Sequence, residues 1–211
     1  MTINYQNLEK IKSLIANFTE TQLLIVTKKQ SIEDILELIN NGQYRFGENR
    51  VQEAKSKYVN LRAQNNFSLH LIGPLQTNKT EEALKLFDVI QTVDRIKLVD
   101  EISKNLVNKS ELRTKEFFIQ VNIGNEEQKS GVHKGNLREL YEYSISKKLN
   151  IKGLMCIPPN IADPTKYFRE MVVLRDNLNR GLKLSMGMSA DYEYALNNQS
   201  NIIRIGSFIF Q

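Results

Sequence analysis

The sequence predicts an α/β fold, a closed (β/α)8 TIM barrel preceded by an N-terminal helix. Short runs rich in apolar and β-branched residues alternate eight times with stretches in which apolar residues recur at helical spacing, which is typical of a parallel sheet. The chain has 211 residues, and eight such units in this length fit a closed barrel with short helices. An open, doubly wound sheet is an alternative that a count of elements leaves open.

The predicted strands are eight short apolar runs, and the polar stretches between them carry the predicted helices. In chain order the strands span residues 23–27, 44–46, 69–72, 89–92, 117–122, 151–155, 183–185 and 202–205. Helical patterns span residues 51–62, 81–87, 96–107, 137–147 and 191–196. A further helix precedes the first strand, with an apolar face made of Leu8, Ile11, Ile15 and Phe18.

Capping residues predict the limits of two more helices. Ser31 is expected as the N-cap of a helix after the first strand, with Asp34 in the capping-box position. Asp163 and Pro164 fit the N-cap and N1 positions of a later helix. Gly181 fits the C′ position at the end of that helix.

The composition is that of an ordinary globular protein, with 41% hydrophobic and 25% charged residues. We expect a single domain over residues 1–211, because no linker, repeat or low-complexity tract divides the chain. The net charge of +5 comes from 29 basic and 24 acidic residues. Because the basic residues are spread along the chain, they argue against a nucleic-acid or lipid surface and favour a modest attraction to phosphorylated small molecules.

Several features that the sequence lacks narrow the range of possible functions. No apolar run approaches about 18 residues and no secretory signal is recognisable, so we expect a cytoplasmic protein that does not enter a membrane. Cys156 is the only cysteine, so no disulfide can form within the chain, and we expect it to be buried. His70 and His133 lie far apart in sequence and suggest no zinc site. We expect His70 in the core and His133 in an exposed loop.

Lys28 is the most informative residue, because it follows the first apolar strand. Functional groups of barrels lie at the C-terminal ends of the strands. An unperturbed lysine has a pKa of about 10.4, so this amine becomes a nucleophile only if burial or a nearby cation favours its neutral form. The alternative is a solvated lysine at a strand end, like the adjacent Lys29.

The last two strand ends together predict a phosphate site. Ser189 precedes the helical pattern at 191–196, so its hydroxyl is expected at a helix N-terminus, where free N–H groups favour an anion. Gly206 and Ser207 follow the eighth strand, and a glycine there lets backbone amides approach a ligand. Taken singly, Ser189 has the alternative of an ordinary N-cap and Gly206 that of a tight turn.

Arg204 lies inside the apolar eighth strand and needs a partner there, because a buried guanidinium is costly when it is unpaired. That partner is a ligand atom or a phosphate, or alternatively a carboxylate in an internal salt bridge. In a closed barrel the amine on strand one and the phosphate cradle after strands seven and eight are adjacent. Pyridoxal 5′-phosphate (PLP) would bridge them, since it carries an aldehyde, a phosphate and a ring nitrogen that an arginine can bond.

Sequence blocks along nearly the whole chain resemble the pyridoxal phosphate homeostasis protein family. The most specific are Phe-Gly-Glu-Asn at 46–49, Ile-Gly-Pro-Leu-Gln at 72–76 and Ser-Met-Gly-Met-Ser at 185–189. Further matching blocks lie at residues 25–28, 92–95, 120–123, 129–131, 153–155 and 204–207.

This resemblance implies a PLP barrel of fold type III, like the N-terminal domain of alanine racemase, with PLP held as an internal aldimine on Lys28. It also implies that Ser189 and the amides of Gly206 and Ser207 hold the phosphate, that Arg204 faces the pyridine nitrogen, and that Asn49 lies beside the cofactor. Met155 is expected to line the cofactor face. The family is regarded as a carrier or regulator of vitamin B6 and amino-acid balance without catalytic turnover, so PLP-dependent apo-enzymes are expected partners.

Two departures and two alternatives remain. The family continues after its lysine toward a proline, whereas here Lys29-Gln30-Ser31 follows, which puts the stiffness of the loop in question. The chain also stops at Gln211, where the family has a few further residues. The first alternative is an amino-acid racemase, which we rank lower because racemases of this fold take a second acid or base from an additional β-domain. The second is an enzyme that uses Lys28 on a sugar phosphate. Both a monomer and a weak dimer are compatible with the sequence.

Overall fold

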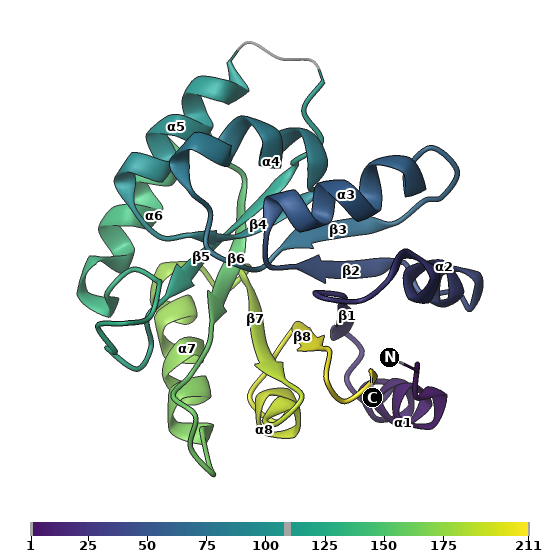
Figure 1. The fold of residues 1–211 in the computed structure, drawn as a ribbon. Coiled ribbons are helices and arrows are strands. Elements are labelled where there is room, and N and C mark those ends of the chain that lie inside the picture. Colours follow the sequence, from purple (N-terminus) through teal and green to yellow (C-terminus); the bar gives the residue numbers. More distant parts are fainter. Residues whose placement is uncertain (1, 108–110, 211) are drawn as a thin grey trace.

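The computed structural model describes residues 2–107 and 111–210. Within these residues eight parallel strands close into one barrel in sequential order, and the last strand pairs with the first. The helices between the strands lie around the outside of the barrel (Figure 1). The closure confirms the predicted barrel and excludes an open sheet, in which two edge strands would lack a partner.

All eight predicted strands are present, with ends that differ from the predicted ones by at most three residues. The largest difference is in the seventh strand, which continues to Met188 where a loop was expected. Gly187 has a φ of +96° there, and the pairing with the eighth strand shifts register between Ser185 and Met188. The strands are β1 (Gln22–Val26), β2 (Arg45–Glu48), β3 (Ser68–Leu71), β4 (Val89–Val93), β5 (Glu116–Val121), β6 (Ile151–Cys156), β7 (Lys183–Met188) and β8 (Ile202–Ile205).

The helices follow the predicted apolar spacing. Leu8 and Ile11 are buried on the first helix as expected, whereas Phe18 lies beyond its end. The helices are α1 (Tyr5–Ile15), α2 (Ile32–Asn40), α3 (Val51–Leu61), α4 (Thr80–Leu86), α5 (Ile96–Leu106), α6 (Leu137–Ser146), α7 (Thr165–Leu178) and α8 (Tyr192–Leu196), with 3-10 turns η1 (Thr77–Lys79) and η2 (Lys134–Asn136).

The predicted caps are right for α2 and displaced for α7. Ser31 and Asp34 form a complete capping box at the start of α2. The cap position of α7 is Pro164 rather than Asp163, whose carboxylate instead accepts a hydrogen bond from the amide of Thr165. Gly181 is not at C′, because the C-cap of the helix is Asn179, two residues earlier, and the N–H of Gly181 donates to the side chain of that asparagine.

Apolar side chains form two layers. The larger layer packs between the strands and the helices. The smaller one fills the barrel interior and consists of Leu24, Val89, Phe118, Met155 and Ile202. Because side chains alternate along a strand, the residues on either side of these, such as Ile25, face the helices instead. This alternation identifies which residues at the strand ends point into the barrel mouth.

The two ends of the described chain meet beside the barrel (Figure 1). Ile3 forms an antiparallel bridge with Phe210, and the N–H of Asn4 donates to the carbonyl of Ile209 at 2.8 Å. The segment that follows β8 is therefore held in place by residues that precede α1.

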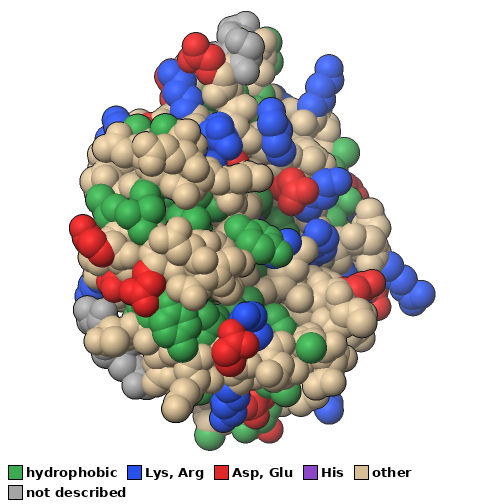
Figure 2. Space-filling view, turned by 90° about the vertical axis from the view of Figure 1, so that its right-hand side faces the viewer, with side chains coloured by type: hydrophobic (Ala, Val, Ile, Leu, Met, Phe, Trp, Pro, Cys, Tyr) green, Lys and Arg blue, Asp and Glu red, His purple; other side chains and the backbone are tan. Residues whose placement is uncertain are grey.

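The surface offers no concentrated charge on the face shown in Figure 2, where basic and acidic side chains are interspersed. No helix in the described ranges is long and apolar enough to cross a membrane. Among those same residues no group of three or more His, Cys, Asp or Glu side chains is arranged to hold a metal ion. Cys156 is fully buried, and His133 is exposed, as expected.

Candidate functional site

The ends of β1 and β8 are neighbours at the C-terminal rim of the barrel. The two strands pair in parallel, with Ile25 opposite Ile205. A Cβ atom added to Gly206 would lie 3.1 Å from the carbonyl oxygen of Val26 and 3.2 Å from its Cβ. The loop with Lys28 and the loop with Gly206 therefore begin side by side.

Lys28 lies on the inward side of β1. Leu24 belongs to the barrel interior, and the Thr27 side chain points outward to Glu48 and Tyr58. The alternation of side chains therefore directs Lys28 towards the mouth, where it is exposed. Lys29 has a φ of +64° and lies in the turn that follows. Of the two lysines, Lys28 has the register expected of the functional one.

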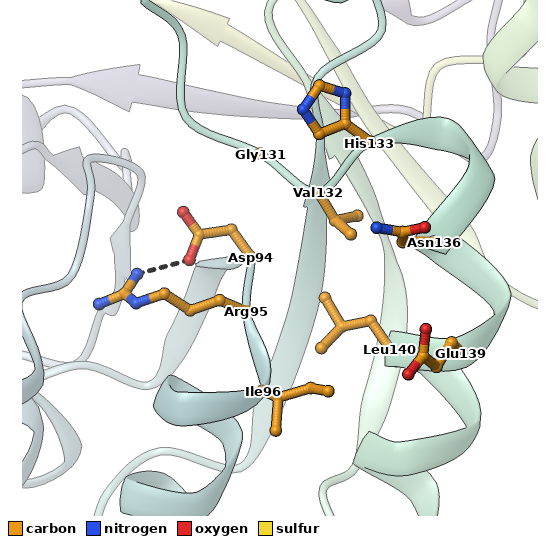
Figure 3. A pocket seen from close by; sticks show the side chains of 9 residues that line it. All are labelled: Asp94, Arg95, Ile96, Gly131, Val132, His133, Asn136, Glu139 and Leu140. Carbon is orange, nitrogen blue, oxygen red and sulfur yellow. Dashed lines mark hydrogen bonds and ion pairs between the residues drawn. The ribbon is translucent and has the colours of Figure 1, made fainter. Parts of the chain in front are cut away.

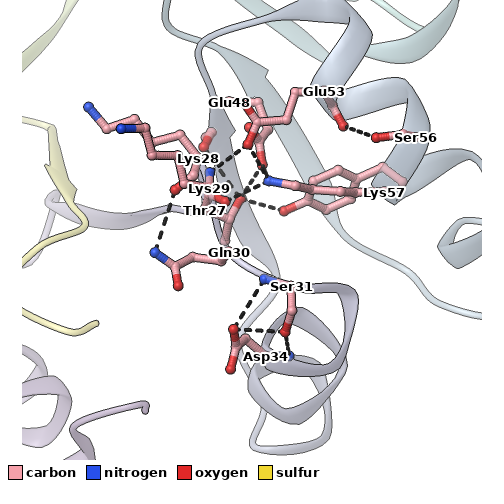
Figure 4. A network of polar contacts seen from close by, with 12 residues as sticks. Thr27, Lys28, Lys29, Gln30, Ser31, Asp34, Glu48, Glu53, Ser56 and Lys57 are labelled. Carbon is pink, nitrogen blue, oxygen red and sulfur yellow. Dashed lines mark hydrogen bonds and ion pairs between the residues drawn. The ribbon is translucent and has the colours of Figure 1, made fainter. Parts of the chain in front are cut away.

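A buried polar network lies behind the Lys28 loop, between β1, β2 and α3 (Figure 4). The Thr27 hydroxyl donates to Oε1 of Glu48 at 2.8 Å and lies 2.6 Å from the Tyr58 hydroxyl. Nζ of Lys57 lies 3.1 Å from the same oxygen of Glu48. Burial raises the pKa of Glu48 above its ordinary value despite the nearby ammonium, and its second oxygen, Oε2, has no hydrogen-bond partner in the described chain.

Ser189 and the turn that contains Gly206 and Ser207 lie together, but not at a helix N-terminus. The Ser189 hydroxyl oxygen accepts hydrogen bonds from the amides of Gly206, at 3.4 Å, and Phe208, at 3.3 Å. The N-cap of α8 is Asp191, and this helix has only five residues, so the expected helix-terminus role of Ser189 is wrong. The amides of the turn after β8 bond the Ser189 hydroxyl instead, and the amides of Ile209 and Phe210 close this turn by donating to the Gly206 carbonyl. Ser207 is exposed between the two donors.

Arg204 points into the barrel and is 3% exposed. Its Nη1 donates to the Ser185 hydroxyl at 2.9 Å, and its Nη2 donates to the carbonyl oxygen of Cys156 at 2.7 Å. Both acceptors are neutral. No carboxylate among the described residues forms a salt bridge with Arg204, so the alternative prediction of an internal salt bridge is wrong. Burial lowers the pKa of Arg204 below its ordinary value.

Residues that the sequence did not assign to the site form a series of hydrogen bonds from Arg204 across the barrel. The Ser185 hydroxyl donates to Oε1 of Gln91 at 2.6 Å, and Nε2 of Gln91 lies 2.8 Å from Nδ1 of His70. Nε2 of His70 lies 3.0 Å from the Ser68 hydroxyl. Burial lowers the pKa of His70 to about 3, so it is neutral, as a core histidine should be. A polar residue inside a short apolar strand, such as Gln91, is the sequence signal that could have revealed this series of hydrogen bonds.

Two further predicted site residues lie in different places. Asn49 is half-buried at the end of β2, on the inward register, and lines a hollow of about 640 Å³ together with Pro74, Gln76 and Lys79. Met155 lies deeper, in the apolar interior cluster, and has no exposed surface. Asn49 is therefore at the mouth, whereas Met155 forms part of the floor beneath it.

A separate depression of about 290 Å³ opens between the starts of α5 and α6 (Figure 3). Asp94 and His133 are among the side chains that line it. Arg95 at its edge is held by Asp94, at 2.6 Å, and by the carbonyl of Leu75, at 2.9 Å. This depression shares the C-terminal side of the barrel with Lys28 but contains none of the predicted site residues.

Curated relatives match the chain along most of its length. The pyridoxal phosphate homeostasis protein of Aquifex aeolicus is 39% identical over 198 residues, which cover 90% of this chain and 86% of the relative. The protein of the same name from Pasteurella multocida is 35% identical over 230 residues, covering 100% and 97%. No protein-family model matches the chain.

Solved structures agree with these relatives. PipY of Synechococcus elongatus PCC7942, with PLP bound, superposes with a TM-score of 0.84 at 30% identity, covering 98% of this chain and 99% of PipY. The alanine racemase of Acinetobacter baumannii superposes with a TM-score of 0.77 at 16% identity, covering 99% of this chain and 62% of the racemase, and this likeness shows a shared barrel alone. With curated relatives 35% and 39% identical over most of both lengths, the chain belongs to the pyridoxal phosphate homeostasis protein family.

Proposed function

We propose that this chain binds PLP at the C-terminal mouth of its barrel, with the Lys28 amine bonded to the aldehyde, and acts in intracellular PLP and amino-acid balance. The observation that carries the proposal is the adjacency of Lys28 and the Gly206 turn on paired strands, where Gly206 packs against Val26. The relatives' name and the PLP held by PipY support it.

The turn after β8 fits a phosphate. The bonds from Gly206 and Phe208 to the Ser189 hydroxyl are 3.4 and 3.3 Å long, longer than the usual range for N–H···O, so both amides are weakly satisfied. Ser207 lies between them, and its N–H makes no hydrogen bond within the described part of the chain. Charged oxygens accept stronger hydrogen bonds than a hydroxyl does, so a phosphate would satisfy these donors better.

Arg204 fits the ring nitrogen of the same ligand. Two of its five N–H groups bond neutral oxygens, which leaves donors for an acceptor at the mouth. Because a guanidinium does not give up its proton, it would bond an unprotonated ring nitrogen. When bound, the cofactor supplies an electrophilic aldehyde and an electron-accepting ring, which an unprotonated nitrogen makes weaker.

The role we propose is storage and delivery of PLP rather than turnover, in keeping with the name of the relatives. The chain would act as a single cytoplasmic domain, a monomer or weak dimer, and exchange PLP with PLP-dependent apo-enzymes. Asn49 would lie beside the ligand, and Met155 would support it from below. No specific observation favours the racemase alternative, because the likeness to alanine racemase concerns the barrel alone.

The test is reduction of the PLP-loaded protein with borohydride, followed by mass-spectrometric mapping of the modified lysine. We expect modification at Lys28 and its loss in Lys28→Ala. Lys29→Ala is the matched control, because Lys29 is the adjacent residue and carries an equally exposed amine. Undiminished covalent PLP in Lys28→Ala would refute the assignment of Lys28.

A further inference from the structure

Two side chains of α3 bond the peptide groups on either side of Lys28 (Figure 4). Nζ of Lys57 donates to the carbonyl oxygen of Thr27 at 2.9 Å. The backbone N–H of Lys29 donates to Oε1 of Glu53 at 2.5 Å. Glu53 and Lys57 lie one helical turn apart and form an ion pair at 2.6 Å. The peptide before Lys28 and the peptide after it are thus tied to one helix.

These contacts restrict the direction in which the Lys28 side chain leaves the backbone. Peptide groups are planar, so the two planes that flank a Cα atom set its φ and ψ. One plane carries the Thr27 carbonyl held by Lys57, and the other carries the Lys29 amide held by Glu53. The Cα–Cβ bond of Lys28 therefore has a direction fixed by α3, although the side chain beyond it is exposed.

The turn after Lys28 contains an unfavourable backbone conformation. Lys29 has a φ of +64°, a left-handed conformation that is unfavourable for a residue with a Cβ atom. The N–H of Gln30 donates to the Thr27 carbonyl at 3.0 Å and closes the turn on one side. The charge-assisted bond to Glu53 secures the other side. The stiffness that a proline would give this loop is supplied here by α3 and by the capping box of Ser31.

The Lys57 ammonium is itself held in place by hydrogen bonds. An ammonium has three donors, and those of Lys57 have three acceptors: the Thr27 carbonyl, Oε1 of Glu48 at 3.1 Å and Oε1 of Glu53. The Lys57 side chain is 10% exposed, and that of Glu48 is fully buried on β2. Through Lys57, the backbone next to Lys28 is therefore fixed relative to strand β2 of the barrel and not only by its own surface loop.

We propose that Glu53 and Lys57 are positioning residues that aim the Lys28 amine at the aldehyde of its ligand. This rests on the proposed function, because it takes Lys28 as the residue that bonds PLP. Neither side chain needs to touch the ligand; each acts through a peptide group next to Lys28. Misplacing a reacting atom by about 1 Å is enough to slow a bond-forming step about 100-fold.

The experiment compares Glu53→Ala, Glu53→Gln, Lys57→Met and Lys55→Met. Each protein is mixed with PLP, quenched with borohydride at intervals, and digested to measure the rate of modification at Lys28. Hydrogen exchange of the Lys29 amide is measured on the same proteins without PLP. Lys55→Met is the matched control, because Lys55 lies on the same helix and pairs with Glu82 at 2.8 Å, while its side chain is 56% exposed.

We expect Glu53→Ala and Lys57→Met to slow modification of Lys28 about tenfold or more, and Lys55→Met to leave it unchanged. Glu53→Gln keeps an acceptor for the Lys29 amide and should recover most of the rate. Exchange of that amide should accelerate in Glu53→Ala and much less in Glu53→Gln. If Lys57→Met does not fold, Glu53→Ala decides the matter, since this carboxylate is partly exposed.

Equal modification rates in all folded variants would overturn the positioning role, as would unchanged Lys29 exchange in Glu53→Ala. A different failure concerns the proposed function. If the unmodified chain traps no PLP, or traps it equally well as Lys28→Ala, then Lys28 is not the PLP lysine and the aiming role falls with it. The Lys29 exchange then reports whether the backbone contact exists independently of any ligand.

Discussion

Arg204 on β8 and His70 on β3 are joined through the barrel interior by two side chains, Ser185 and Gln91. The direction of these hydrogen bonds is fixed at one end, because a guanidinium only donates. The Ser185 hydroxyl therefore donates onward to Gln91, and the Gln91 amide donates to Nδ1 of His70. His70 is thereby fixed as the tautomer protonated at Nε2, which faces the Ser68 hydroxyl.

The first prediction concerns pH and His70. Burial lowers its pKa from 6.5 to about 3, so between these values the unfolded chain binds a proton that the folded chain does not. The stability that neutral His70 contributes is present above pH 6.5 and is lost as the pH falls towards 3, by a total on the order of 5 kcal/mol. Unfolding by urea at several pH values should show this loss in the parent chain and not in His70→Gln. Parallel pH profiles for the two proteins would contradict the buried, neutral state.

The second prediction concerns Ser185. Ser185→Ala removes the group that both accepts from Arg204 and donates to Gln91, leaving two buried polar groups without that partner. We expect a loss of about 1–3 kcal/mol in the free energy of unfolding, together with weaker PLP retention. Ser144→Ala is the matched control, since that buried hydroxyl donates to a carbonyl of its own helix at 2.7 Å. An equal, small loss in both variants would mean that Ser185 adds nothing to the position of Arg204.

The third prediction concerns Gly206. A methyl group there would lie 3.1 Å from the Val26 carbonyl oxygen, so Gly206→Ala should push the turn away from β1. We expect the Kd for PLP to rise about tenfold or more, equivalent to 1.4 kcal/mol, while the affinity for pyridoxal, which lacks the phosphate, changes less. Gly135→Ala is the control, because a Cβ at Gly135 meets nothing within 4 Å. Equal weakening for both ligands would remove the turn from the phosphate site.

The fourth prediction concerns Glu48. Its pKa is raised chiefly by burial, so the folded chain holds this proton more tightly than the unfolded chain. Stability is therefore lost as the pH rises from about 4.3, the ordinary value for a glutamate, through the raised pKa of the folded state. Glu48→Gln removes this titration, so its free energy of unfolding should gain on that of the parent chain with rising pH. Urea unfolding across that range measures the difference, and a constant difference would rule out the raised pKa.

The fold and the position of the turn after β8 could be predicted from the sequence, because local sequence patterns indicate both. Eight apolar runs between helical patterns predicted the barrel, and the glycine and serine after the eighth strand predicted the turn beside β1. The errors came where local patterns mislead. Met-Gly-Met at 186–188 resembles a loop, yet it belongs to β7 because a glycine permits the bend. Ser189 resembles a helix-terminus residue, yet its hydroxyl is bonded by the amides of the turn after β8.

The sequence by itself determined the alternation of eight strands with helices, the place of Lys28 at the end of the first strand and the presence of a cation inside β8, because local apolar patterns fix these. The pairing of β1 with β8 then decided that the sheet closes. Only the tertiary structure decided what Arg204 bonds and what holds the Lys28 loop. Gln91 and Ser185 lie 94 residues apart, and Lys57 reaches back 30 residues to Thr27. Such partners come together only when the barrel closes, since no periodicity along the chain relates residues on different strands.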